Sequence, residues 1–144
     1  MKLPTNQLRS YNAGILQGKA YRVLTANLTD TLAPYDLSIP EWKLLGQLTE
    51  YNDIKLARLA EILGVEPPLV TSLAASLEKK KLIKRIDDKN DKRTKVVTGT
   101  KKGLELVEKI EPVVRAKLRE LLKGTSKLEL LAYSRVLSAI VKNG

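Results

Sequence analysis

The sequence contains neither cysteine nor histidine among its 144 residues. These absences exclude disulfide bonds, thiol nucleophiles, thiol redox sensing, zinc sites of the Cys/His type and every catalytic triad or general base that uses histidine. No apolar run approaches the roughly 18 residues that a membrane span needs, and the first residues lack the apolar stretch of a signal peptide. We therefore expect a cytoplasmic binding protein that has no cofactor and is not an enzyme.

Positive charge is in excess and is concentrated in one segment. The chain has 26 Lys and Arg against 16 Asp and Glu, a net charge of +10. Residues 78–103 hold 11 of the cations and four of the anions, which is a surplus of seven. A solvated charged face is one interpretation, but a surplus confined to one segment is typical of a polyanion-binding surface. The segment is strand- and turn-like, so nucleic acid is favoured over an anionic membrane.

The middle of the chain has the pattern of a helix-turn-helix. Residues 38–41, Ser-Ile-Pro-Glu, are typical of a helix start with a capping box and a proline in the first turn. Residues 54–63 form a second predicted helix that ends at Gly64. A third begins at residues 66–68, Glu-Pro-Pro, and ends in the lysine run 79–81. Two short helices joined by a tight turn can place the second one in a major groove.

A β-hairpin is predicted directly after the helix-turn-helix. Residues 82–86 and 94–98 are rich in β-branched side chains and flank a polar loop at 87–93, so the hairpin forms a wing. The loop lacks the glycine and the closing glutamate of a calcium site. We expect no metal there.

Long helices are predicted at both ends of the chain. The first covers residues 8–33 and stops at Pro34. Another runs from 101 to about 122 after a Thr100 cap, and Pro112 predicts a kink or break in it. The last covers roughly 127–141, and its predicted inward side chains are Leu128, Leu131, Leu137 and Ile140.

The predicted fold is mainly α with a small β-hairpin wing. Residues 38–100 form the winged helix-turn-helix, which we expect to bind DNA. Residues 1–37 and 101–144 form a helical region that is apolar over lengths one small module cannot cover. We therefore expect these helices to pack on a second copy of the chain, with a bundle within one chain as the alternative.

The sequence resembles the MarR family of bacterial and archaeal transcription regulators over essentially its whole length. The stretches that carry this resemblance are Leu37–Leu45, Leu59–Val65, Leu77–Arg85, Asp91–Lys95 and Thr100–Gly103. The resemblance implies a homodimeric winged-helix repressor that binds pseudo-palindromic operator DNA. It also implies release of that DNA when a small, often phenolic, molecule binds near the junction of the dimer and DNA-binding regions.

The resemblance assigns the wing pair Asp91 and Arg93 to DNA binding. In the family, the arginine at this position enters the minor groove and the aspartate orients it. A guanidinium is weakly hydrated and suits the negative potential of a narrow, A·T-rich minor groove. The alternative is that the pair only closes the hairpin.

The recognition helix departs from the family pattern. It begins with Pro67 and Pro68, and Thr71-Ser72 stands where Thr-Arg is typical, which removes the bidentate arginine–guanine contact. We expect base readout from Thr71, Ser72 and Ser76, and from Pro67 or Pro68 against thymine methyl groups. The expected phosphate contacts are Lys84, Arg85, Lys89 and Lys92.

Two further departures lie at the edges of the wing. Lys81 stands where a helix-ending glycine is usual. Gly99 stands where a leucine is usual, so we expect a looser wing base.

An effector site is predicted near the dimer axis. Its candidate residues are Tyr11, Ile15, Tyr21, Arg22 and Trp42. Ordinary core or interface packing is the alternative for Tyr11 and Trp42. Two other functions stay open, a winged-helix module that binds a protein and a small enzyme or ligand carrier, and neither would lose affinity for DNA steeply with salt.

Overall fold

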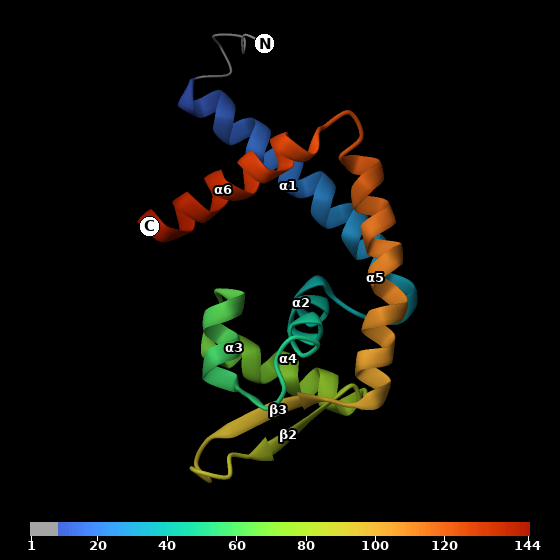
Figure 1. The fold of residues 1–144 in the computed structure, drawn as a ribbon, viewed down its shortest axis with the longest axis vertical. Coiled ribbons are helices and arrows are strands. Elements are labelled where there is room, and N and C mark those ends of the chain that lie inside the picture. Colours follow the sequence, from blue (N-terminus) through green and yellow to red (C-terminus); the bar gives the residue numbers. More distant parts are fainter. Residues whose placement is uncertain (1–8) are drawn as a thin grey trace.

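The computed structural model describes residues 9–144, and the predicted start of the first helix at Leu8 lies outside them. Figure 1 shows α2, α3, α4 and the sheet at one end, α1 and α6 at the other, and α5 running between the two ends. The elements are α1 (Ser10–Leu32), η2 (Ala33–Tyr35, a 3-10 helix), α2 (Ile39–Gln47), β1 (Ile54–Lys55), α3 (Leu56–Leu63), α4 (Pro67–Lys79), β2 (Ile83–Asp87), β3 (Lys95–Gly99), α5 (Lys101–Leu121) and α6 (Lys127–Asn143).

Local capping fixes where the helices begin and end. The Ser38 hydroxyl accepts a hydrogen bond from the Glu41 amide at 3.2 Å, and the Glu41 carboxylate accepts from the Ser38 amide at 3.0 Å. The Thr100 hydroxyl accepts from the Gly103 amide at 3.1 Å. Gly64 ends α3 with φ +65°, a left-handed conformation that glycine adopts without strain. These predicted boundaries are confirmed.

The sheet has three antiparallel strands in the order β1-β3-β2. The predicted hairpin corresponds to β2 and β3, each shifted by one residue. The prediction that Ile54 and Lys55 begin a helix is wrong, because they form β1 and pair with Val97 and Val96 of β3. This pairing buries Ile54 and depends on a strand about 40 positions away, so local spacing gave no sign of it.

One hydrophobic core holds the winged end together. Its fully buried side chains include Leu44, Leu45, Leu48, Leu59, Val70, Leu77, Ile83, Val97 and Ile110. Gly103 is required at the start of α5, since a Cβ there would lie 2.0 Å from the Leu82 carbonyl oxygen. The expectation of a looser wing base at Gly99 is wrong, because Leu104 Cδ2 lies 2.7 Å from where a Cβ would be and fills the space.

The long helices differ from prediction in two ways. α5 continues through Pro112, so the predicted break is wrong, whereas the kink stays a prediction. The proline is exposed, on the side where solvent can satisfy the carbonyl left without a donor. Leu128, Leu131 and Ile140 of α6 do not face inward within the chain, because they are exposed. Leu137 is exposed as well. Among the described residues, no helix combines the length and hydropathy needed to cross a membrane.

Candidate nucleic-acid interface

α4 presents one face to the core and the other to solvent. Val70, Ala74 and Leu77 are buried and hold the helix against α2 and α3. Helical spacing places a column of side chains on the opposite, exposed side. That column consists of Pro68, Ser72, Ala75 and Lys79.

Two of the predicted base-reading hydroxyls already have partners within the protein. The Thr71 hydroxyl donates to the Pro67 carbonyl oxygen at 3.2 Å. The Ser76 hydroxyl donates to Glu41 Oε2 at 2.9 Å, so Ser76 faces α2 and is half-buried. Ser72, by contrast, is exposed, and its hydroxyl has no hydrogen-bond partner within residues 9–144.

Glu41 is a buried carboxylate that the functional prediction missed. Its side chain bridges the start of α2 to the end of α4, where Lys80 Nζ lies 3.0 Å from Oε2. Burial raises the pKa of Glu41, but hydrogen bonds from the Ser38 backbone and from the Lys80 and Ser76 side chains outweigh it, so the pKa lies below its ordinary value. The capping-box motif was the only sign of this residue in the sequence. Glu41 therefore fixes the position of α4.

The wing pair is joined as the resemblance implied. Asp91 Oδ1 accepts from the Arg93 backbone amide at 3.0 Å and from Arg93 Nε at 3.1 Å. These hydrogen bonds, first that of the side chain and then that of the backbone, hold the pKa of the Asp91 carboxyl below its ordinary value. The Arg93 side chain is nevertheless 91% exposed. The pair thus closes the turn and also leaves the Arg93 guanidinium exposed to solvent.

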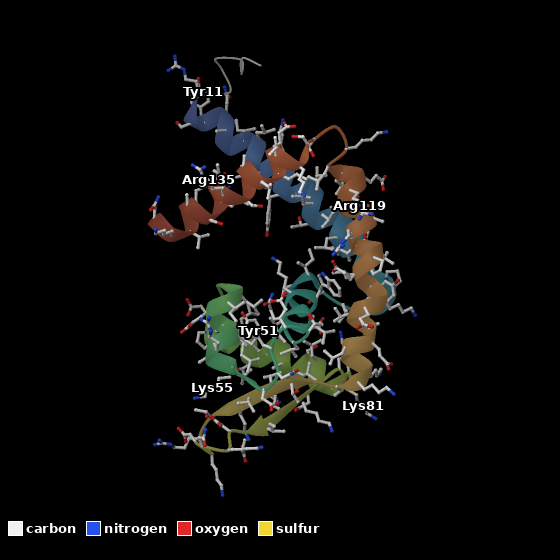
Figure 2. The ribbon with its side chains drawn as sticks, in the orientation of Figure 1. Tyr11, Tyr51, Lys55, Lys81, Arg119 and Arg135 are labelled. Atoms are coloured by element: carbon white, nitrogen blue, oxygen red, sulfur yellow. The ribbon has the colours of Figure 1, made fainter. Side chains whose placement is uncertain are left out.

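A second carboxylate ties the wing to the helix-turn-helix. The Asp88 side chain is only 13% exposed and lies 3.5 Å from Lys55 Nζ. Asp88 also accepts from the Asn90 amide at 3.1 Å. Figure 2 shows Lys55 at the side of the molecule where the wing loop lies. Neither residue was predicted to matter, because the contact joins segments far apart in the sequence.

The predicted phosphate contacts fall into two groups. Lys84, Lys89 and Lys92 are exposed and form no ion pair within the described residues. Arg85 instead pairs with Glu78, at 3.0 Å from Nη2 to Oε1 and 3.0 Å from its amide to Oε2. The hydrogen bond from the Arg85 side chain, then that from its amide, lowers the pKa of Glu78. Arg85 is therefore engaged in joining α4 to β2.

The predicted effector residues do not converge within one chain. Trp42 lines a cleft of about 610 Å³ between α2, α3 and α5, beside Lys43, Glu50 and Glu111. Tyr21 lines a different groove, between α1 and α6. Tyr11 lies near the start of α1, distant from the winged end in Figure 2. Ile15 and Arg22 are exposed on α1 and line neither space.

Comparison with known proteins gives consistent matches. The sequence model of the MarR family matches residues 37–95. The HTH-type transcriptional regulator YwaE of Bacillus subtilis is 25% identical over 128 residues, which cover 89% of this chain and 75% of YwaE.

Two solved structures share the fold. A complex of Staphylococcus aureus MepR with DNA has a TM-score of 0.82 and 23% identity, covering 91% of this chain and 97% of MepR. Rhodococcus jostii CouR bound to p-coumaroyl-CoA has a TM-score of 0.81 and 19% identity, covering 89% and 90% of the two chains. These likenesses establish the fold of nearly the whole chain.

Proposed function

We propose that this chain is a regulator of the MarR family, whose sequence model matches residues 37–95, and that it is a cytoplasmic homodimeric repressor that binds a pseudo-palindromic DNA operator and is released by a small molecule. The observation that carries the proposal is the joint exposure of α4 and of the wing, where the Arg93 side chain is 91% exposed beside Asp91 and Lys84, Lys89 and Lys92 form no ion pair within residues 9–144. MepR, which has the same fold, is solved with DNA. The role is binding, and it requires no cofactor.

The proposed DNA contact uses both parts of residues 38–100. α4 enters the major groove, and two copies in a dimer reach successive grooves about 34 Å apart. Arg93 enters the flanking minor groove, where its charge is favoured. Lys84, Lys89 and Lys92 contact phosphates, and Arg85 positions β2 instead of contacting DNA.

The proposed dimer forms through residues 1–37 and 101–144. α1 and α6 border an apolar groove of about 1000 Å³, lined among others by Leu16, Tyr21, Leu137 and Ile140. Exposed apolar surface this continuous marks an interaction site. Gly14 and Gly18 of α1 meet little within the chain, which leaves room for the close approach of a second helix.

We place the effector in the Trp42 cleft. Its volume is within the range of small-molecule sites, roughly 300–1,000 Å³. It lies between α2 and α3 of the winged end and α5, so a ligand there would shift the balance of dimer conformations. CouR is solved with p-coumaroyl-CoA, an aromatic thioester, so aromatic acids and their thioesters are the first probes. Trp42 is the only tryptophan, and its fluorescence reports binding directly.

The test of DNA binding is its dependence on salt. A regulator loses affinity for a mixed DNA pool with a log–log slope near −0.9 for each phosphate neutralised. Lys89→Ala should reduce the slope by about one for each subunit. The matched control is Lys127→Ala at the start of α6, which should leave the slope unchanged. A protein-interaction module or an enzyme would show no such slope.

A further inference from the structure

The exposed face of α4 lacks the side chains that read bases by paired hydrogen bonds. No Arg, Lys, Asn or Gln occurs between Pro67 and Glu78. These four residue types make the bidentate contacts to guanine and adenine in the major groove. The first cation of the helix is Lys79, in its last turn. A contact of that kind is therefore missing from the middle of α4.

The hydroxyl groups of α4 do not replace this missing bidentate contact to a base. The Thr71 hydroxyl donates a hydrogen bond to the Pro67 carbonyl oxygen, and the Ser76 hydroxyl donates one to the Glu41 carboxylate. Ser72 alone has a free hydroxyl, and a single hydroxyl accepts or donates to either base of a pair with little discrimination.

What α4 does expose is apolar. Leu69 is 44% exposed, and Pro68 and Ala75 lie on the outward side. Because the Thr71 hydroxyl is turned back to the helix, its methyl group is the part free to touch a base. In the major groove, the apolar feature that distinguishes one base pair from another is the C5-methyl group of thymine.

We infer that α4 recognises thymine through its C5-methyl group, and that guanine contributes no contact in the major groove. The inference rests on the proposed DNA binding and adds the chemistry of recognition. Sequence preference then comes from methyl contacts on α4 together with the minor-groove contact of Arg93.

The test uses a duplex enriched from random DNA by the full chain. One version replaces the thymines of the half-sites by uracil, which removes only the methyl groups. A second replaces guanine by 7-deazaguanine, which removes the N7 acceptor. We expect uracil to weaken binding about fourfold for each contacted thymine, the effect of one methyl group, and 7-deazaguanine to change it by less than twofold.

Protein variants locate the contact on α4. Thr71→Ser removes the methyl group and should reduce the preference for thymine over uracil, whereas Thr71→Val keeps a methyl group and should retain the preference. Ser72→Arg supplies the missing guanidinium and should create sensitivity to 7-deazaguanine in a duplex selected with that variant.

The outcomes separate the inference from the function on which it rests. Equal affinity for thymine and uracil duplexes, a dominant loss with 7-deazaguanine, or binding without enrichment of any sequence would each overturn the thymine readout while DNA binding stands. Failure to bind any DNA at low salt would overturn the proposed function itself.

Discussion

Glu41 acts on the DNA-binding surface from inside the protein. It is 6% exposed, and its carboxylate accepts from Ser38, Ser76 and Lys80, which belong to the start of α2 and the end of α4. A buried charge is stable only when its oxygens are satisfied, as they are here. The orientation of α4 is thus tied to an ionised side chain.

We predict that Glu41→Gln destabilises the protein in a pH-dependent manner. Glutamine can still accept from the Ser38 amide, but it removes the buried carboxylate that Lys80 contacts and leaves Lys80 only the exposed Asp36 at 3.7 Å, at a cost of about 2 kcal/mol at neutral pH. The folded-state pKa of Glu41 lies below the ordinary value of 4.5. Its contribution is therefore complete above that pH and is lost as the pH falls through the folded pKa. Urea unfolding measures the free energy of unfolding of both proteins. The difference between wild type and Glu41→Gln should be smaller at pH 3.5 than at pH 7.

Glu129→Gln is the matched control for that experiment. Glu129 occupies the same position in the Ser126 capping box of α6, with contacts at 2.9 and 3.1 Å, but has no lysine partner among residues 9–144. We expect a much smaller change in stability. Equal effects of the two substitutions would mean that capping, and not the Lys80 contact, makes Glu41 important.

Lys81 carries backbone strain that can be relieved. It follows α4 with φ +62°, a conformation unfavourable for a residue with a Cβ. We predict that Lys81→Gly raises the free energy of unfolding by about 1 kcal/mol, measured by urea unfolding. Lys81→Ala removes the same charge but keeps the Cβ, so it should give no such gain. A gain in both variants would assign the effect to charge.

At the scale of elements, the wing is held by four polar contacts. β2 is joined to α4 by the Arg85–Glu78 pair, and the loop is joined to β1 by the Lys55–Asp88 pair. Asp91 closes the turn itself. Lys95 and Asp87 also pair across the strands. Preorganisation of this kind lowers the free-energy cost of the proposed contact between Arg93 and DNA.

We predict that Arg93→Ala weakens binding about tenfold for each subunit, the loss of one charge-assisted contact of roughly 1.5 kcal/mol. It should also relax the preference for A·T pairs at the flanks of the site. Arg93→Lys should restore the salt dependence without the A·T preference, because an ammonium lacks the planar, weakly hydrated guanidinium. Binding titrations and footprints measure both effects. An unchanged footprint in Arg93→Ala would remove the wing from the interface.

The elements that could be predicted from sequence are those whose signals are local. Ser38, Thr100 and Gly64 mark helix boundaries because each cap involves residues within three or four positions. β1 was missed because its partner strand is remote. The predicted break of α5 at Pro112 is wrong, because the exposure of the proline on the solvent side lets the helix continue.

For the candidate site, the sequence predicted where the positive charge lies, but not which side chains are engaged by partners within the protein. Composition located the basic segment, and exposure leaves Lys84, Lys89, Lys92 and Arg93 available for the proposed role. Whether a polar side chain faces out depends on partners across the fold. Ser76 is engaged by Glu41, 35 positions away. Such long-range pairing has no signature in a local pattern.

At the scale of the whole molecule, charge and apolar surface are segregated to opposite ends. Residues 78–103 hold 11 cations and four anions, a surplus of seven, whereas α1 has three charged residues and α6 has four. A chain of net charge +10 repels its own copies. The proposed association through α1 and α6 would keep the two basic ends apart and free to bind one duplex.

This arrangement predicts that Ile140→Glu disrupts the dimer. Ile140 is 59% exposed within one chain and lines the α1–α6 groove, where a buried charge would have no partner. Sedimentation should show a lower mass, and thermal unfolding should occur at a lower temperature, because dimer stability depends on concentration. The control Lys142→Glu also introduces a glutamate, but on the opposite face of α6, so it should leave the mass measured by sedimentation unchanged. A dimer that persists in Ile140→Glu, or a monomeric wild type that still protects two half-sites one helical turn apart, would show that the two copies meet elsewhere.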